Sequence, residues 1–350
     1  MFKARLADNF RLPIRNSLKE HLKRYYDVIV ISGYGSSYLE YAGTNKWWLK
    51  EVKGARAFDK FVLSLLKSIY IGTRFLLRLI LGRKKRDGLF LKRNINFKDF
   101  LYSSTKIMGV DKKLLLEIHV PNHDYRIHCP LNKEDFIVMT KHEEAIIGLF
   151  RPKEGDTVVD VGAHMGRYTI TCSKSVGASG KVIAVEAHPY NFRILQRNLW
   201  LNKLTNVKAL NCAVYSKKAR LKLYLPDEDL GYTMHHSLMT NYLSTKYNKE
   251  IERRYMEVEA DTLDNLLRSR GITTIDWIKI DVEGAEYEVL KGAKEMLSAN
   301  KPISILVEVH GKDTYRPTID LLRSQNFNIE FEKTYDNGEK HVLARKLTGA

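Results

Sequence analysis

The sequence predicts an α/β fold in which a mostly parallel sheet closes with an antiparallel C-terminal hairpin, preceded by a basic, partly helical N-terminal extension. From residue 156 onward, apolar strand-like runs alternate with helical runs, a pattern typical of parallel strands joined by crossover helices. The last two strand-like runs are joined by Asp336, Asn337 and Gly338, a strong hairpin signal. Residues 1–100 hold 22 Lys and Arg against 8 Asp and Glu.

The alternating half of the chain divides into elements by the period of its apolar residues and by its turn residues. The expected strands are 157–161, 181–186, 207–211, 221–225, 256–260, 275–280, 303–309 and the two hairpin strands within 326–335 and 340–346. The expected helices begin near 166 and 262 and cover 189–201, 285–297 and 315–324. A polar stretch, 226–255, interrupts the alternation.

Length and charge suggest one catalytic domain with an appendage. The chain has 350 residues, of which 44% are hydrophobic, and a formal net charge of +17. Beyond residue 100 the 36 basic and 33 acidic residues nearly balance, so the basic surface belongs to the extension. We expect the extension at 1–100, lead-in strands and a helix at 101–150, and the catalytic domain at 151–350.

The cysteines and the N-terminus suggest where the protein works. Cys129, Cys172 and Cys212 are too few and too scattered for a disulfide framework or a zinc site, which favours a reducing compartment. The first residues lack the apolar core and cleavage site of a secretory signal. We therefore expect a cytoplasmic protein.

The extension contains the most apolar stretch of the chain, residues 59–82. On a helix its four basic residues form one narrow stripe, with Phe, Leu and Ile on the other sides: Lys60, Lys67, Arg74 and Arg78. A membrane span tolerates such charges poorly, whereas a helix lying in the interface tolerates them well. The cluster RKKR at 83–86 adds affinity for acidic lipids. We expect residues 59–86 to bind an anionic membrane surface.

Two other interpretations of the extension remain open. The helix at 59–82 can instead be buried or packed on a partner and followed by an ordinary solvated charge run. Basic clusters also neutralise the phosphates of nucleic acids, although the aromatic residues here form no recognisable RNA-binding module. A strand with a turn is expected at 25–35.

The most informative motif is VVDVGAHMGRYT at 158–169, a strand that runs through a glycine-bearing turn into a helix. Such a turn bends sharply and presents helix amides to an anionic group. A dinucleotide fingerprint has G-x-G-x-x-G spacing, whereas here Asp160, Gly162 and Gly166 surround His164, whose side chain would crowd a pyrophosphate. Glu186 ends the next strand, where a carboxylate accepts bonds from ribose hydroxyls. These residues favour S-adenosylmethionine (SAM), which has an amino acid tail and no pyrophosphate.

Four successive motifs resemble those of FkbM-like methyltransferases, in the same order: VDVGAHMGRYT, EAHPYNFRILQRNLWLN, DTLDNLL and WIKIDVEGAEYEVLKGA. The resemblance covers about residues 140–345 and implies the class I, Rossmann-like SAM-methyltransferase fold. It also implies methyl transfer from SAM to hydroxyl groups, often of sugars or polyketides. By this resemblance the cofactor is bound by Asp160, Gly162, His164, Gly166, Glu186, Asn211 and Ala213. His164 departs from the asparagine usual in the family.

Candidate catalytic residues follow two neighbouring strands. Asp281 and Glu283 come after the strand WIKI, while Glu308 and His310 lie at the end of ISILVEV, so we expect all four at one crevice. Asp281 or His310 is the expected general base for an alcohol. Alternatively, Asp281, Glu308 and His310 hold a divalent metal, which we do not favour. The structural alternatives are that Asp281 caps a helix beginning near Gly284 and that His310 is a plain loop residue.

The polar stretch at 226–255 is expected to bind the acceptor. Tyr232 and His235 suit stacking on and bonding to a sugar, and Arg253 with Arg254 suits a phosphate on a lipid-linked glycan. Glu283, after the strand WIKI, is a further expected acceptor-binding residue. The alternative is a surface loop. We therefore expect a SAM-dependent O-methyltransferase that acts on a saccharide or glycolipid at a membrane. The rivals are a nucleic-acid methyltransferase and a catalytically inactive scaffold of the same fold. The sequence leaves the oligomeric state open.

Overall fold

The computed structural model describes residues 28–34, 115–120, 125–130, 139, 144–225, 236–239, 254–298, 302–336 and 338–346. The expected helix at 59–82, the basic cluster at 83–86 and three expected acceptor residues, Tyr232, His235 and Arg253, lie outside these residues. The chain divides into two compact units, Met1–Lys141 and His142–Ala350. Within the described part, no helix is both long enough and apolar enough to cross a bilayer.

The first unit contains a three-stranded sheet in the order β1-β2-β3. Its strands are β1 (Val28–Tyr34), β2 (Leu115–Val120) and β3 (Tyr125–Pro130). β1 is the strand expected within 25–35, and it pairs in parallel with β2, which in turn pairs antiparallel with β3. A strand of the basic extension therefore shares a sheet with strands of the expected lead-in.

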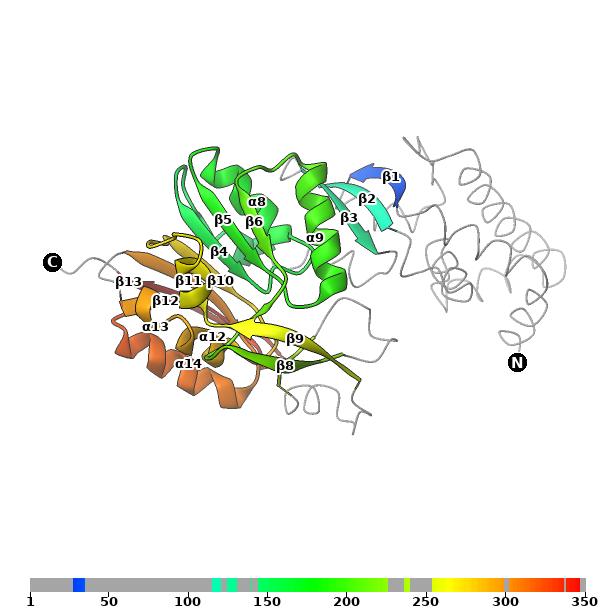
Figure 1. The fold of residues 1–350 in the computed structure, drawn as a ribbon. Coiled ribbons are helices and arrows are strands. Elements are labelled where there is room, and N and C mark those ends of the chain that lie inside the picture. Colours follow the sequence, from blue (N-terminus) through cyan, green and yellow to red (C-terminus); the bar gives the residue numbers. More distant parts are fainter. Residues whose placement is uncertain are drawn as a thin grey trace, which may run out of the picture. The chain divides into compact units, whose positions relative to one another are not determined.

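The second unit is built on a seven-stranded sheet in the order β12-β13-β11-β10-β4-β5-β6 (Figure 1). Five strands run parallel beside one another: β4 (Thr157–Val161), β5 (Lys181–Val185), β6 (Val207–Leu210), β10 (Trp277–Ile280) and β11 (Ile303–Val309). β12 (Asn328–Thr334) and β13 (Lys340–Lys346) form the C-terminal hairpin, and β13 pairs antiparallel with both neighbours. This arrangement confirms the predicted, mostly parallel sheet with its antiparallel C-terminal hairpin.

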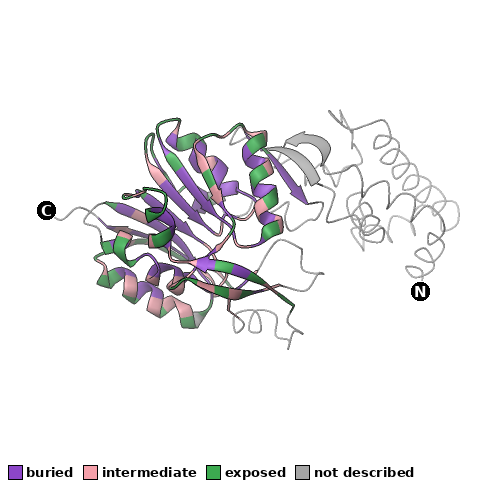
Figure 2. Cartoon of the chain, viewed as in Figure 1, coloured by how far each residue is buried: buried purple, intermediate pink, exposed green. Residues whose placement is uncertain are grey.

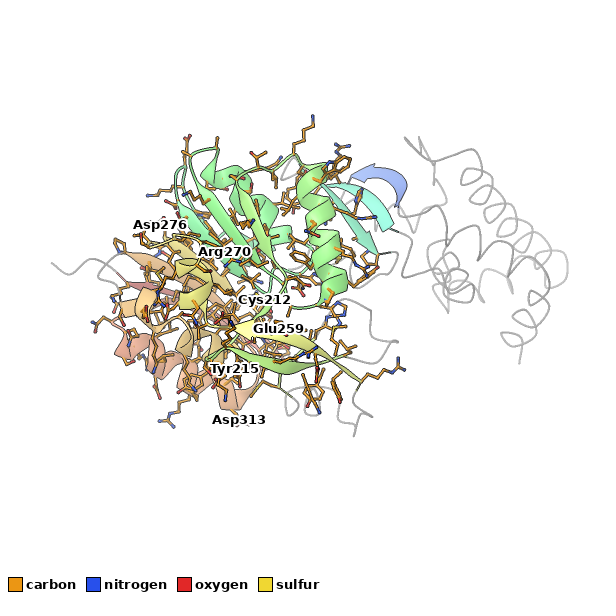
Figure 3. All side chains as sticks on the ribbon, in the orientation of Figure 1. Cys212, Tyr215, Glu259, Arg270, Asp276 and Asp313 are labelled. Carbon is orange, nitrogen blue, oxygen red and sulfur yellow. The ribbon has the colours of Figure 1, made fainter. Side chains whose placement is uncertain are left out.

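Helices cover both faces of the sheet, and its inner strands are largely buried (Figures 1 and 2). Alternate strand residues point to opposite faces, so Val158 joins the core with α7 and α8, while Val159 joins the core with α11 to α14. The helices are α7 (Glu144–Ile147), α8 (Arg167–Val176), α9 (Pro189–Leu201), α11 (Leu263–Arg268), α12 (Glu286–Lys291), α13 (Lys294–Ser298) and α14 (Lys312–Ser324). Asp276, labelled in Figure 3, directly precedes β10, and its carboxylate accepts a hydrogen bond from the Thr157 amide at the start of β4, at 2.8 Å.

A second, three-stranded sheet holds the strands expected at 221–225 and 256–260. β7 (Ala213–Val214), β8 (Ala219–Tyr224) and β9 (Tyr255–Asp261) pair in the order β7-β9-β8. β8 and β9 alternate between more buried and more exposed residues, whereas β10 is buried throughout. This alternation shows that one face of the smaller sheet is more exposed than the other.

Two helices differ from the predicted bounds. The helix expected at 285–297 is divided into α12 and α13, because Asp264 of α11 accepts hydrogen bonds from the amides of Glu295 and Met296 at 2.9 and 3.0 Å. These bonds satisfy the first turn of a new helix. The helix expected from 315 begins at Lys312, so Pro317 lies inside it.

Candidate active site

The loop between β4 and α8 requires glycine because it packs on other loops and helices. Gly162 has φ +79°, and a Cβ there would lie 1.8 Å from the carbonyl oxygen of Asp281. Gly166 has φ +98°, and its Cβ would lie 2.7 Å from Cδ1 of Leu195 in α9. The two glycines thus permit a close approach to the loop after β10 and to α9. We call residues 162–166 the cofactor loop.

Glu186 fastens the cofactor loop to the end of β5. Its two carboxylate oxygens accept hydrogen bonds from the amides of His164 and His188, each at 2.8 Å. Burial raises the pKa of Glu186 to about 7, although the two amides and Lys279 act in the opposite direction. Asn211 donates its side-chain amide to the carbonyl oxygens of Glu186 and Ala187, at 2.8 and 3.1 Å. The ends of β4, β5 and β6 therefore meet around Glu186.

Asp160 is fully buried in β4, beneath the cofactor loop. Its Oδ2 accepts a hydrogen bond from the Thr169 hydroxyl at 2.5 Å. Its Oδ1 is buried and has no hydrogen-bond partner among the described residues. Burial raises the pKa of Asp160, while the nearby Lys279 and the Thr169 hydrogen bond lower it. An unsatisfied buried carboxylate oxygen is costly unless a cation or a donor reaches it.

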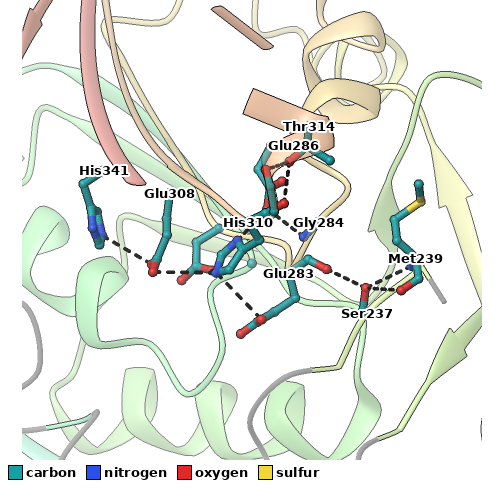
Figure 4. A network of polar contacts seen from close by, with 12 residues as sticks. Ser237, Met239, Glu283, Gly284, Glu286, Glu308, His310, Thr314 and His341 are labelled. Atoms are coloured by element: carbon teal, nitrogen blue, oxygen red, sulfur yellow. Dashed lines mark hydrogen bonds and ion pairs between the residues drawn. The ribbon is translucent and has the colours of Figure 1, made fainter. Parts of the chain in front are cut away.

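A second polar group, which we call the His310 cluster, lies at the ends of β10 and β11 (Figure 4). Nδ1 of His310 lies 2.8 Å from Oε1 of Glu286. Nε2 faces three further carboxylates, at 3.6 Å from Glu308, 3.7 Å from Glu283 and 3.9 Å from Asp281. The cluster therefore unites the four candidate residues Asp281, Glu283, Glu308 and His310 at one place, as predicted.

The charge of the His310 cluster follows from its acidic surroundings. Only 2% of the His310 side chain is exposed, and this burial disfavours the charged imidazolium. The carboxylates of Glu283, Glu286 and Glu308 outweigh the effect of burial and raise the pKa of His310 well above its usual value. These carboxylates therefore favour the imidazolium form of His310. Glu308 also lies 3.3 Å from Nε2 of His341 on β13.

Asp281 is the most solvent-accessible carboxylate of the His310 cluster, with 28% of its side chain exposed. It is held by Lys279, whose Nζ lies 2.9 Å from Oδ2. It does not cap α12, because that helix begins at Glu286 and has no side-chain cap. His310 does follow a strand, as a loop residue would, but it is buried between carboxylates.

Two sets of metal-type donor atoms overlap in the same place. One consists of Asp281, Glu283 and His310, and the other of Glu308, His310 and Glu339; the donor atoms of each set lie within 4.8 Å of one another. The trio expected from the sequence, Asp281, Glu308 and His310, is divided between these sets.

The remaining predicted residues lie in different surroundings. Ala213 is buried in β7 and pairs with β9. Arg254 is exposed at the end of the polar stretch, and its carbonyl oxygen accepts a hydrogen bond from the Leu225 amide at 2.9 Å. Within the same stretch, the ring of His236 stacks on that of His188 with centroids 4.0 Å apart. The hydroxyl of Ser237 lies 2.5 Å from the carbonyl oxygen of Glu283 (Figure 4).

Sequence reasoning missed Lys279, Glu286 and His341. Lys279 gave a usable signal, since a lysine inside a short, otherwise apolar strand needs a partner when that strand is buried. Glu286 looked like an ordinary acidic residue of a helix, and only the fold reveals its contact with His310. His341 reaches Glu308 because β13 pairs beside β11, with the two residues in direct register.

Comparison with known proteins adds a sequence relationship to this geometry. A family model described as the methyltransferase FkbM domain matches residues 160–329. The chain is 31% identical over 195 residues to methyltransferase sdnD of Sordaria araneosa, covering 49% of this chain and 73% of that protein. It is 27% identical over 220 residues to 31-O-demethyl-FK506 methyltransferase FkbM of Streptomyces tacrolimicus, covering 56% and 82%. The crystal structure of a SAM-dependent O-methyltransferase from Thermotoga maritima aligns at 13% identity and a TM-score of 0.37, covering 67% of this chain and 78% of that one.

Proposed function

The chain belongs to the FkbM family of SAM-dependent methyltransferases, and from this premise we propose that it methylates a hydroxyl group of a saccharide or a glycolipid at a membrane surface. The observation that carries the proposal is the position of Asp281. Its backbone carbonyl packs on Gly162 of the cofactor loop, while its carboxylate belongs to the His310 cluster. The proposed cofactor loop and the proposed proton acceptor therefore lie next to each other.

Two buried carboxylates fit the polar groups of SAM. The Oδ1 atom of Asp160 lacks a partner among the described residues and suits the ammonium of the amino acid tail. Each oxygen of Glu186 accepts one amide and keeps a lone pair for a ribose hydroxyl. When bound, SAM supplies an electrophilic methyl group on a sulfonium. The protein has to align this group with the acceptor oxygen.

An alcohol acceptor must also lose its proton, and Asp281 is the better placed of the two candidate bases. It is partly exposed, whereas His310 is almost fully buried. The raised pKa of His310 favours the protonated imidazole, which is a poor proton acceptor. We assign proton removal to Asp281 and assign His310 the part of a cation that holds Glu283, Glu308 and Asp281 together.

O-methylation is supported by a relative and by the chemistry of the His310 cluster. The Streptomyces tacrolimicus protein is named as a methyltransferase of 31-O-demethyl-FK506, a name that describes an oxygen acceptor. A general base is needed for a hydroxyl acceptor, and a partly exposed carboxylate meets this need. A divalent metal on one of the two donor sets is the alternative way to acidify the hydroxyl.

The choice of a sugar-type acceptor rests on the polar stretch 226–255. Tyr232 and His235 suit stacking on and bonding to a sugar, while Arg253 and Arg254 suit a phosphate. Residues 236–239 of this stretch contact both the loop after β5 and the loop after β10. The first contact is the His188–His236 stack, and the second is between Ser237 and Glu283. These contacts support acceptor binding by the stretch that contains them.

Membrane attachment is proposed for residues 59–86, and a pelleting assay with anionic vesicles tests it. We expect the full chain to pellet and the deletion of 59–86 to stay in the supernatant. Replacing only the four basic residues at 83–86 by serine separates the cluster from the helix, and we expect intermediate pelleting. Equal pelleting of the full chain and the deletion would contradict attachment through this segment.

Incubation with methyl-labelled SAM and separated cell lipid, glycan and RNA fractions tests the acceptor class. We expect label in a lipid or glycan fraction, and none with Asp281→Asn. Label confined to RNA would favour the nucleic-acid alternative, with a steep dependence on salt. A folded protein that neither binds SAM nor transfers label would be the inactive scaffold.

A further inference from the structure

Lys279 lies where a charged side chain is hard to bury, in the middle of the central sheet. Its strand, β10, is buried at all four residues, and β10 pairs with β4 on one side and β11 on the other. The side chain of Lys279 is only 6% exposed. In register, Lys279 stands directly beside Asp160 of β4, and the two residues therefore share a face of the sheet.

The ammonium of Lys279 contacts both the cofactor loop and the His310 cluster. Nζ lies 2.9 Å from Oδ2 of Asp281 and 3.5 Å from the carbonyl oxygen of Gly162 in the cofactor loop. It also lies 4.9 Å from the ring centroid of Tyr168, in the first turn of α8. One buried cation therefore contacts the expected base, the cofactor loop and the helix that follows this loop.

The charge of Lys279 also acts on the carboxylates near the cofactor loop. Lys279 lowers the pKa of both Asp160 and Glu186, against the burial that raises them. This ammonium therefore compensates the buried carboxylates of Asp160 and Glu186 as well as that of Asp281. Removing one member of a buried ionic group is costly because the remaining charges lose their compensation.

We propose that Lys279 is a positioning residue that couples the cofactor loop to Asp281, so that cofactor binding and proton removal depend on the same ammonium. The inference rests on the proposed methyl transfer. Lys279 does not touch the reacting atoms; it fixes the carbonyl of Gly162 and the carboxylate of Asp281 relative to each other. A misplacement of about 1 Å costs roughly 100-fold in rate in well-aligned sites.

The test compares Lys279→Met with Lys291→Met in the full-length protein. Lys291 also pairs with a carboxylate, that of Glu288 at 2.9 Å, but on the surface of α12. We expect Lys279→Met to lower kcat at saturating SAM by about 100-fold and to weaken SAM binding in calorimetry several-fold, per folded molecule. Lys291→Met is expected to match the wild type in both measurements.

A second variant separates positioning from folding. Lys279→Cys can be alkylated with 2-bromoethylamine, which restores an ammonium at nearly the length of lysine. We expect the alkylated variant to recover at least tenfold in kcat over the untreated one, with the wild type alkylated in parallel to control for Cys129, Cys172 and Cys212.

Two results would overturn the inference: a folded Lys279→Met with wild-type kcat and SAM affinity, or an alkylated Lys279→Cys no faster than the untreated variant. A wild-type protein that is folded and binds no SAM would instead remove the proposed function, and the coupling with it. The two failures are distinguishable because the wild type is measured in every series.

Discussion

The two halves of the site are built in different ways. At the ends of β4 and β5, most of the contacts are made by backbone groups. The glycines allow close packing, and backbone amides donate hydrogen bonds to Glu186. At the ends of β10 and β11, side chains hold side chains, through His310 and the carboxylates around it. The first half is therefore fixed largely by chain geometry, and the second by charge balance.

The two halves should respond differently to mutation. A change in the backbone-built half should act mainly on folding and cofactor affinity, because the chain itself must move. A change in the charge-built half should act mainly on turnover, because the main chain around it is supported by the sheet. The following experiments test this division.

Asp281→Asn should have the largest effect. We expect kcat to fall by about 10²- to 10⁴-fold while SAM affinity stays near that of the wild type, since the amide keeps the shape but accepts no proton. Initial rates with the fraction that supports wild-type turnover, together with calorimetry, measure both quantities. Asp313→Asn, an exposed change in the first turn of α14, is the matched control. An Asp281→Asn enzyme within twofold of the wild type would remove Asp281 from the mechanism.

Gly162→Ala should destabilise the fold. The new Cβ would stand 1.8 Å from the carbonyl oxygen of Asp281, so two loops must separate. We expect a loss of about 2 to 4 kcal/mol in the free energy of unfolding, measured by urea titration. Gly271→Ala has a similar positive φ, +66°, but nothing within 4 Å, so its cost should be about 1 kcal/mol. Equal losses in the two variants would show that the contact with Asp281 does not matter.

Glu186→Gln should change how stability depends on pH. The pKa of Glu186 is about 7 in the folded protein and near 4.5 when unfolded, so the folded state binds more protons between these values. Protonated Glu186 therefore stabilises the folded state by about 3 kcal/mol below pH 4.5. This contribution is lost as the pH rises through 7. Urea titrations at several pH values should show the wild type losing stability relative to Glu186→Gln across this window. Parallel curves would contradict a buried, protonatable Glu186.

Chelation should have the smallest effect. The raised pKa of His310 favours a positive charge between Asp281, Glu283 and Glu308, so we expect the site to work without a divalent ion. We expect kcat to stay unchanged after dialysis against EDTA. A loss of activity that Mg²⁺ or Mn²⁺ restores would replace proton removal by Asp281 alone with a metal-assisted step.

The same difference explains what the sequence could predict. The strand at 157–161, the helix at 189–201 and the hairpin were predicted closely, because alternating apolar runs and turn residues encode them locally. The separate sheet of β7, β8 and β9 was not predicted, because pairing partners are far apart in the chain. The break before α13 depends on Asp264, which lies in another helix.

The candidate site residues were also predicted where a local sequence pattern marks them and missed where their contacts come from distant elements. Glu186 was singled out because it ends a strand next to a glycine-bearing turn, and the structure brings it to the cofactor loop. Glu286 and His341 were missed because their partners in the His310 cluster come from other elements. Charge balance among side chains from several strands leaves no local pattern, so such a cluster becomes visible only once the sheet order is known.

Calorimetric titration of the folded, full-length protein with SAM and with its demethylated product tests the central claim most directly. The account predicts saturable binding of both compounds, weakened in Glu186→Gln and retained in Asp281→Asn. A well-folded wild-type protein that binds neither compound would contradict the assignment of the β4 and β5 ends as a SAM site.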